Sequence, residues 1–321
     1  TKQDLENLEA LTPSIQDTVI VGGGLIGIEL AEMLHARGKK VTFLVREKSF
    51  WSNVLPQGES ELINKHIVSH GIDLRLETTL SEILEDENGR VKAIRTDSGE
   101  IISCQFVGLT AGVRPNVDFI KDSAIETKRG ILVNKYLETN QPDIYAIGDC
   151  AEQQEPVPGR RSIEAVWYTG RMMGETLART LTGNKTAYHP GHWFNSAKFF
   201  DIEYQTYGLV AAHPKEPETH FHWQDSSKNL AITVAFDENT NEFLGINTFG
   251  IRMRQEIFDQ MLSKKRSVLH VMEHLSDCNF DPEFFKSYET EIISNFNAAQ
   301  HTDIKPKKKS WSRIFNNLIA K

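Results

Sequence analysis

The chain has 321 residues, which is enough for two or three domains at the usual size of roughly 100 to 200 residues each. Apolar residues make up 39% and charged residues 25%, a composition that excludes a disordered chain and supplies a core. The 44 Asp and Glu outnumber the 36 Lys and Arg and give a net charge of −8, which argues against nucleic acid as a partner.

Three cysteines, Cys104, Cys150 and Cys278, lie far apart and form no CxxC pair. This spacing predicts neither a disulfide framework nor a cysteine zinc site, and it favours a cytoplasmic location. No apolar run reaches the ~20 residues of a membrane-spanning helix. The first residues lack the basic and apolar regions of a secretory signal peptide, and the chain opens without a Met.

Strand and helix patterns alternate between residues 17 and 112 at the spacing of βαβ units. In chain order we predict a strand at 18–21, a helix at 25–37 ended by Gly38, a strand at 41–45, a helix at 59–70 ended by Gly71, short strands at 83, 91–94 and 101–102, and a strand at 106–109. The turn dipeptides Asn88-Gly89 and Ser98-Gly99 join the short strands. We therefore predict an α/β fold with a Rossmann-type parallel sheet and an antiparallel flap.

Beyond Gly112 the pattern changes twice. The middle part predicts a hairpin at Arg129-Gly130, a strand at 144–147 and a helix at 163–181. Aromatic-rich strands then lead to a hairpin at 239–241 and to helices at 253–262 and 268–275, an α+β pattern. These changes divide the chain into three predicted parts, residues 1–112, 113–187 and 188–321.

Residues 22–27 read Gly-Gly-Gly-Leu-Ile-Gly, a G-x-G-x-x-G pattern between a predicted strand and a predicted helix. Gly22 permits a tight turn, Gly24 lets the backbone approach a pyrophosphate, and Gly27 allows close packing of helix on strand. The helix N-terminus adds free N–H groups and a positive dipole. A merely structural glycine turn is the alternative, but the strand-turn-helix context favours dinucleotide binding.

The end of the second predicted strand bears on the choice between NADH and NADPH. An acidic residue about 20 positions after the glycines would bind the ribose 2′-hydroxyl of NADH. The sequence there reads Val45-Arg46-Glu47-Lys48, and Arg46 can pair with the 2′-phosphate of NADPH. We therefore favour NADPH. The alternative is that Arg46 is a solvated charge and Glu47 holds the ribose of NADH.

A second motif ends the strand predicted at 144–147, where Gly148-Asp149 follows directly. A carboxylate at the carboxyl end of a strand can accept hydrogen bonds from a polyhydroxylated ligand. Gly-Asp is also a common turn, so these residues alone leave ligand binding and a simple turn equally open.

The two motifs, with Ala111-Gly112-Val113-Arg114-Pro115-Asn116 between them, resemble the FAD-dependent pyridine nucleotide-disulfide oxidoreductase superfamily. The similarity covers residues 1 to about 185, and the rubredoxin, ferredoxin and nitrite reductase-like branch fits better than the dithiol enzymes. It implies an enzyme that passes a hydride from NAD(P)H to FAD and electrons on to a small redox protein or small molecule. No side-chain nucleophile is needed, so no catalytic residue is assigned.

The resemblance also implies which residues bind the cofactors, Gly112 in the shared segment among them. Asp149 would bind the flavin ribityl hydroxyls, with Gly148 near the pyrophosphate. Glu29 matches the acidic position that borders the nicotinamide, unless it is an ordinary exposed helix carboxylate. Backbone N–H groups near Val166 would stabilise negative charge on the reduced flavin, and Glu164 is the matching side chain.

Only one G-x-G-x-x-G motif is present, whereas the resemblance implies an earlier one for the ADP part of FAD. We therefore expect an N-terminally truncated chain, with a partial FAD-binding domain at 113–187 and poor FAD binding by the fragment. Two other interpretations remain. One is a dehydrogenase with a single NAD(P), and the other is a partner- or membrane-binding module that responds to a nucleotide.

Weaker patterns lie near the C-terminus. His270 and His274 are spaced i, i+4, and His220 and His222 share a strand face, but we predict no metal site because no cysteine or carboxylate pattern accompanies them. Residues 305–321 predict a basic amphipathic helix that packs on its own domain or a dimer mate, or contacts an anionic membrane. The part at 188–321 loosely resembles the interface domain of the superfamily, which suggests a homo-oligomer.

Overall fold

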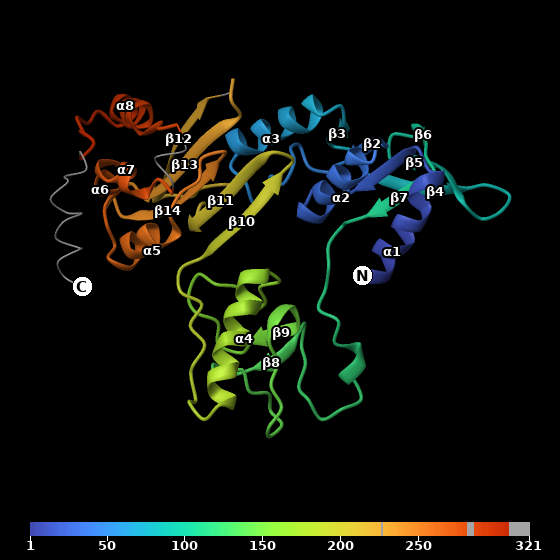
Figure 1. Ribbon diagram of the computed structural model, residues 1–321, viewed down its shortest axis with the longest axis horizontal. Helices are drawn as coiled ribbons and strands as arrows, with labels where there is room; N and C mark the ends of the chain where they lie inside the picture. Colours follow the sequence, from blue (N-terminus) through green and yellow to red (C-terminus); the bar gives the residue numbers. More distant parts are fainter. Residues whose placement is uncertain (226, 281–285, 308–321) are drawn as a thin grey trace. The chain divides into compact units, whose positions relative to one another are not determined.

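The computed structural model describes residues 1–225, 227–280 and 286–307. The chain divides into two compact units, a larger unit formed by residues 1–112 and 196–321 and a smaller unit formed by residues 113–195. Figure 1 follows the chain through both. Within the described ranges, no helix combines the length and the apolar character that crossing a membrane requires.

The first sheet of the larger unit is parallel, with four strands in the order β3-β2-β1-β7 (Figure 1). Its elements and the helices before and between them are α1 (Lys2–Leu11), β1 (Asp17–Val21), α2 (Leu25–Ala36), β2 (Lys40–Leu44), α3 (Gln57–Ser69), β3 (Asp73–Arg75) and β7 (Phe106–Leu109). Strand β1 is central, because Val19 pairs with Thr42 on one side and Val107 on the other. Val19 and Ile20 are fully buried, as expected for a strand of a covered parallel sheet. The predicted Rossmann-type sheet is confirmed.

The predicted antiparallel flap is confirmed as well. It consists of β4 (Leu80–Glu85), β5 (Val91–Thr96) and β6 (Ile101–Ser103), in that order. Gly89 and Gly99 have positive φ angles of 71° and 87°, which the tight turns between these strands require. Ile94 and Cys104 pack with Val19 and other side chains of the parallel sheet in one apolar cluster.

The second sheet of the larger unit is antiparallel, with the order β10-β11-β14-β13-β12. Its strands are β10 (Phe194–Phe199), β11 (Ile202–Gly208), β12 (Glu218–Asp225), β13 (Leu230–Asp237) and β14 (Phe243–Phe249), and the helices that follow are α5 (Gln255–Ser263), α6 (Val268–Glu273), α7 (Leu275–Cys278) and α8 (Glu289–Gln300). Helix α5 contacts β11 and β14, and helix α8 contacts β12. The α+β character predicted for the C-terminal part is confirmed.

Helix α3 contacts both sheets (Figure 1). Nδ2 of Asn247 in β14 donates a hydrogen bond of 2.9 Å to Oε2 of Glu59 in this helix. A Cβ at the preceding Gly58 would lie only 2.8 Å from Nε2 of His222 in β12. The helix can therefore approach this strand closely because Gly58 has no side chain. Buried residues that share one core across the helix and both sheets include Ile20, Phe43, Ile63, Phe199 and Phe249.

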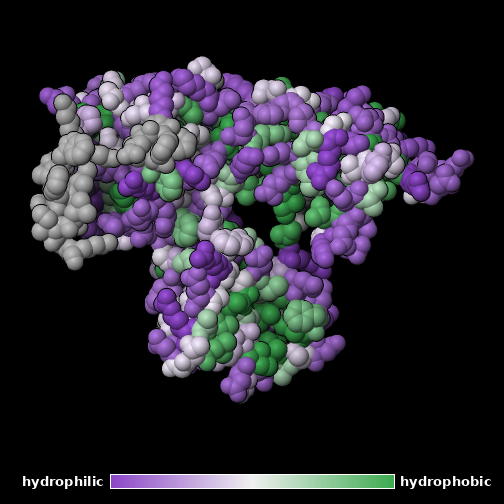
Figure 2. Space-filling model, viewed as in Figure 1, coloured by the Kyte–Doolittle hydropathy of each residue, from purple (hydrophilic) through white to green (hydrophobic). Residues whose placement is uncertain are grey.

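The smaller unit is built around helix α4 (Trp167–Leu181) and a parallel pair of short strands, β8 (Ile131–Val133) and β9 (Ala151–Gln153). Two short 3-10 helices, η2 (Asp118–Ile120) and η3 (Gly148–Cys150), complete it. Its exposed apolar side chains include Val113, Phe119, Ile144, Trp167 and Leu181. Figure 2 shows apolar side chains gathered on the surface of this unit, a feature typical of interaction or ligand-binding surfaces.

Two expectations for the smaller unit are wrong. Residues 144–147 form no strand, because only Tyr145 pairs there, in an isolated bridge with Glu138. Backbone hydrogen bonds join Thr139 to Ile144 and Ala146 to Leu137, but the pairing is limited to this single bridge, so no strand forms. The helix expected from residue 163 begins at Trp167, since Val166 has extended φ and ψ angles of −135° and 134°.

The basic amphipathic helix expected at 305–321 falls mostly on residues 308–321, which lie outside the described residues. Of its basic side chains, Lys305 and Lys307 are described. Nζ of Lys305 lies 3.8 Å from Oδ2 of Asp303, and Nζ of Lys307 lies 3.3 Å from Oε2 of Glu273 in α6. The helices expected at 253–262 and 268–275 are present as α5, α6 and α7.

Glu59 should make the stability of the fold depend on pH. Burial raises the pKa of its carboxyl from 4.5 to about 7. The folded protein therefore binds more protons than the unfolded chain between these values, so the stabilisation is complete below about pH 4.5 and is lost as the pH rises through 7. Glu59→Gln, which mimics the protonated form, should stabilise the protein near pH 8 by up to about 3 kcal/mol.

The measurement is urea unfolding at pH 5 and pH 8 of the original chain and of Glu59→Gln. Glu61→Gln is the control, because Glu61 is an exposed carboxylate in the same helix. Equal pH dependence in the original chain and Glu59→Gln would contradict this prediction.

Candidate functional site

The loop at residues 22–27 connects β1 to α2 and has no room for side chains at two of its glycines. Gly22 has a φ of 123°, and a Cβ there would lie 2.5 Å from the carbonyl oxygen of Thr110. A Cβ at Gly27 would lie 2.3 Å from the carbonyl oxygen of Gly22. Both positions therefore require glycine, as the motif predicts.

Gly24 is glycine for a different reason. It precedes the first residue of α2, and no described heavy atom lies within 4 Å of the position that its Cβ would occupy. Among the described residues no side chain caps this helix end, and Ile28 makes the first intrahelical hydrogen bond, to the carbonyl of Gly24. The N–H groups before Ile28 have no partner within the helix and lie at its positive end. This arrangement can hold a phosphate.

Three strands hold this loop at their carboxyl ends. Thr110, which follows β7, donates from its N–H and its Oγ1 to the carbonyl of Val21, at 2.8 and 2.9 Å. The N–H of Gly22 donates to the carbonyl of Leu44 in β2 at 3.0 Å. The loop is therefore fixed to the parallel sheet before any ligand is present.

Arg46 and Glu47 follow the end of β2, next to the glycine loop. Val45 before them is fully buried, and a Cβ at Gly23 would lie 2.7 Å from its Cγ1. Arg46 is largely exposed, and its Nε donates to Oε1 of Glu47 at 2.8 Å. This hydrogen bond raises the pKa of the guanidinium, which stays charged. Glu29 lies in α2 with its carboxylate exposed.

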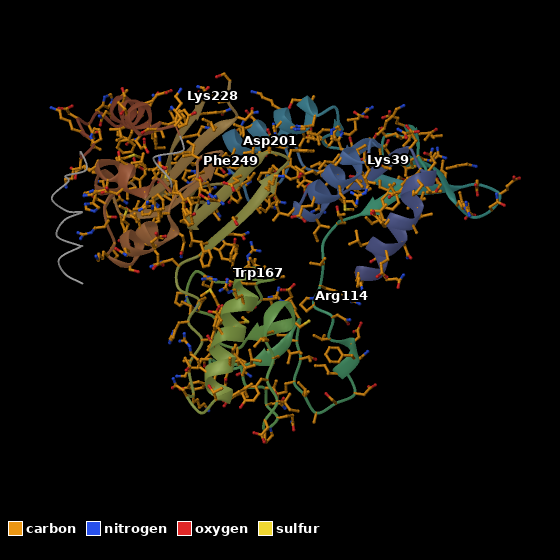
Figure 3. The ribbon with its side chains drawn as sticks, viewed as in Figure 1. Lys39, Arg114, Trp167, Asp201, Lys228 and Phe249 are labelled. Carbon is orange, nitrogen blue, oxygen red and sulfur yellow. The ribbon has the colours of Figure 1, made fainter. Side chains whose placement is uncertain are left out.

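The smaller unit places the Gly-Asp motif against the start of α4. Gly148 has a φ of 75°, and its Cα lies 3.5 Å from the position of a Cβ at Gly170 in the first turns of the helix. Asp149 is exposed beside it. Helix α4 begins at Trp167, labelled in Figure 3, and no side chain in the described residues caps it at Val166. A carboxylate and an open helix N-terminus thus lie close together.

An ion pair that the sequence did not suggest fixes the segment leading into α4. Arg160 donates from Nε and Nη2 to both oxygens of Glu164, at 2.6 and 2.5 Å, and both side chains are less than one tenth exposed. Arg160 also donates to the carbonyl of Gly191 and lies over the Trp193 ring. The Glu164 carboxylate is thus engaged in positioning this segment, and Thr169 also donates to it.

The structure therefore brings the proposed residues together in two groups. The first group lies at the glycine loop of the larger unit and consists of Gly22, Gly24, Gly27, Glu29 and Arg46. The second lies at the start of α4 in the smaller unit and consists of Gly148, Asp149, Glu164 and Val166. Gly112, with a φ of 124°, is the last residue of the first segment of the larger unit.

Comparisons with known proteins agree with this geometry. The chain is 28% identical over 257 residues to the NAD(P)H sulfur oxidoreductase (CoA-dependent) of Pyrococcus abyssi, covering 76% of this chain and 56% of that protein. It is 34% identical over 173 residues to rubredoxin-NAD(+) reductase of Acinetobacter baylyi, covering 53% and 42%. A solved FAD-dependent pyridine nucleotide-disulphide oxidoreductase from Desulfovibrio vulgaris superposes with a TM-score of 0.71 at 20% identity, covering 92% of this chain and 75% of that one.

The chain spans about half the length of the curated relatives that it matches. Residues 1–174, more than half of the chain, match the family model described as pyridine nucleotide-disulphide oxidoreductase. With the glycine loop and the Gly-Asp turn in place, these matches show that the chain belongs to the pyridine nucleotide-disulphide oxidoreductase family.

Proposed function

We propose that the protein is a flavin-dependent oxidoreductase that passes a hydride from NAD(P)H to FAD and electrons on to an acceptor. The observation that carries the proposal is the glycine loop, which has no room for a side chain at Gly22 and Gly27 and has room at Gly24, before a helix start that no described side chain caps. The Gly148-Asp149 turn lies beside the start of α4, which likewise has no cap among the described side chains, and these residues supply the groups for binding the flavin. In the same proposal, residues 1–112 bind NAD(P)H, residues 113–187 belong to the FAD domain and residues 188–321 form an interface domain of a homo-oligomer.

The roles of the residues follow from their chemistry. When bound, FAD accepts the hydride and hands on its electrons. The N–H groups at the start of α2 bind the NAD(P)H pyrophosphate, and Glu29 borders the nicotinamide. Asp149 accepts hydrogen bonds from the ribityl hydroxyls, with Gly148 close to the FAD pyrophosphate. The N–H groups after Val166, on the segment that the Arg160–Glu164 pair holds in place, would stabilise negative charge on a bound flavin.

We propose only the class of the electron acceptor. One relative is named as a sulfur oxidoreductase and another as a rubredoxin reductase, so related chains serve both small molecules and small redox proteins. We place this protein's acceptor within those two classes. The three free cysteines, two of them buried, fit a reducing compartment such as the cytoplasm. Burial also raises the pKa of the Cys104 thiol to about 11, which makes this thiol unreactive.

The test of this function is the flavin content of the full-length protein and its NAD(P)H-dependent reduction of an artificial electron-accepting dye. Asp149→Ala should lower the bound FAD per chain and reduce activity in proportion, because the lost carboxylate no longer holds the ribityl hydroxyls. Asp118→Ala, an exposed acidic residue of the same unit, should leave both unchanged. A protein without flavin that reduces no dye would refute the proposal.

Gly24→Ala should weaken NADPH binding about tenfold or more while leaving the melting temperature nearly unchanged. The backbone at Gly24 is extended and a Cβ there meets open space, so the fold tolerates it, but the methyl group occupies the place of the pyrophosphate. Titration calorimetry with NADPH measures the change, with the helical Gly174→Ala as the control. Unchanged affinity in Gly24→Ala would contradict the assignment.

Arg46→Gln should weaken NADPH binding about tenfold and NADH binding far less, because only NADPH carries the 2′-phosphate. Glu47→Gln, which frees Arg46 from its partner, should keep or strengthen the preference for NADPH. Dissociation constants for both nucleotides decide the matter. Equal losses for NADH and NADPH in Arg46→Gln would show that Arg46 does not select the cofactor.

A further inference from the structure

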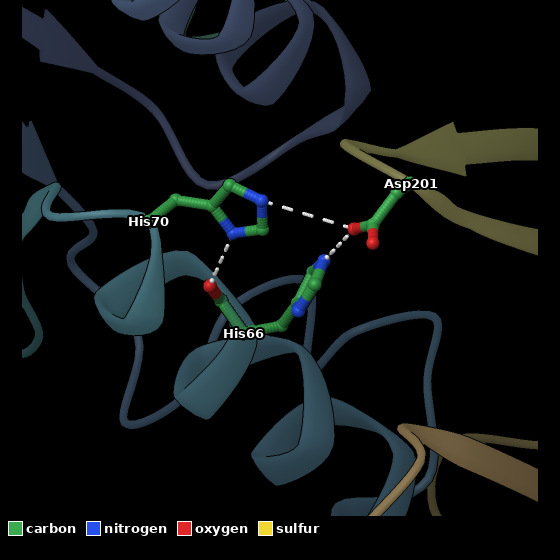
Figure 4. A group of neighbouring side chains, drawn as sticks. All are labelled: His66, His70 and Asp201. Carbon is green, nitrogen blue, oxygen red and sulfur yellow. Dashed lines mark hydrogen bonds and ion pairs between the residues drawn. The ribbon is translucent and has the colours of Figure 1, made fainter.

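Three side chains of the kinds that bind metal ions meet between helix α3 and the turn that joins β10 to β11 (Figure 4). His66 and His70 are spaced i, i+4 and so lie on one face of the helix end, with ring centroids 4.4 Å apart. Oδ1 of Asp201 lies 2.7 Å from Nε2 of His66 and 3.8 Å from Nε2 of His70. All three ligand atoms lie within 4.8 Å of one another.

These distances suit one ion bound to all three residues. A tetrahedral ion with bonds of about 2.0 to 2.1 Å keeps its ligand atoms roughly 3.3 Å apart. The two distances to Oδ1 fall on either side of that value. The Asp201 side chain is 76% exposed, so a small rotation can equalise them without disturbing the core.

The imidazole rings are also held as metal-ligating histidines usually are. Nδ1 of His70 lies 2.9 Å from the carbonyl oxygen of His66 and donates its proton there, which leaves the Nε2 lone pair free. The Phe200 ring stacks on His70 at 4.2 Å and fixes its plane. The Asn229 amide lies 3.3 Å from Nδ1 of His66, and rotating this amide presents its oxygen to an Nδ1–H.

His66 is the buried member of the group. Its side chain is only 3% exposed, and its Nε2 pairs with Oδ1 of Asp201 at 2.7 Å. A bound ion would replace this direct contact and join the same two groups.

We propose that His66, His70 and Asp201 bind a divalent transition-metal ion of the zinc class, with a further coordination position open to solvent. Two imidazole nitrogens and one carboxylate oxygen favour zinc, cobalt or nickel over magnesium and calcium. The ion would join the end of helix α3 to the turn at residues 200–201. This site shares no residue with the glycine loop or the Gly-Asp turn and does not depend on the proposed oxidoreductase function.

A second group of similar composition, His270, Glu273 and His274, is less suited to a metal. Nζ of Lys307 lies 3.4 Å from Nε2 of His274 and 3.3 Å from Oε2 of Glu273, so a cationic side chain already occupies that position. It provides a matched i, i+4 histidine pair for comparison.

The experiment uses the 321-residue protein after removal of metals with a chelator. Calorimetric titration with zinc chloride should show one ion bound per chain, and zinc should raise the melting temperature because it binds the folded state. Cobalt chloride should give the visible absorption of a low-coordinate Co²⁺ site, and excess magnesium should compete for neither ion. A protein that binds no zinc would overturn the proposal.

His70→Gln and Asp201→Asn should each weaken zinc binding about tenfold or more and remove the cobalt absorption, whereas His274→Gln should leave both unchanged. Asp201 is exposed, so the melting temperature of metal-free Asp201→Asn should match that of the original chain and show that the fold is intact. Unchanged binding in both site variants, or loss of binding in His274→Gln alone, would also overturn the proposal.

Discussion

The larger unit depends on helix α3, because this helix packs on the parallel and the antiparallel sheet at once. At its start, Gly58 leaves no space between the helix and the His222 ring, and the Glu59 carboxyl is buried against Asn247. Burying a carboxyl is unfavourable unless it is protonated or hydrogen-bonded. This contact therefore favours the one orientation of the helix that pairs the carboxyl with Asn247, and it does not simply strengthen the packing of the helix. The helix covers the parallel sheet, and hydrogen bonds to the strands of that sheet hold the glycine loop in place.

Local patterns predicted the parts of the fold that local physics determines. Helices α2 and α3 end two residues before Gly38 and Gly71, where a positive φ suits glycine, and the flap turns at Gly89 and Gly99 follow the same rule. The strand expected at 144–147 does not form because its pairing with residues 137–139 is limited to one bridge, and no local pattern reveals how far two segments pair. The start of α4 expected at residue 163 is wrong for a related reason. The ion pair between Arg160 and Glu164 holds the segment before Trp167 outside the helix.

The site residues divide in the same way. The glycines of the loop could be found from sequence because their spacing is fixed, and at Gly22 and Gly27 close backbone contacts leave no room for a side chain. His66, and the buried Glu59 outside the sites, could not, because their partners Asn229 and Asn247 lie 163 and 188 residues away along the chain. The i, i+4 spacing of His66 and His70 was a usable signal, yet it gains meaning only when folding brings Asp201 beside it.

Different interactions therefore hold the two ends of α3. The N-terminal end is fixed by shape and by a carboxyl whose protonation follows pH, whereas the C-terminal end meets an exposed carboxylate through two imidazoles. Apolar packing alone would allow the helix to slide or rotate slightly between the sheets, because it is non-directional. Directional polar contacts at both ends remove that freedom. The turn at 200–201 is also held from the other side, where Phe200 donates its N–H to Glu32 of α2, so α2, α3 and the antiparallel sheet are tied at one point.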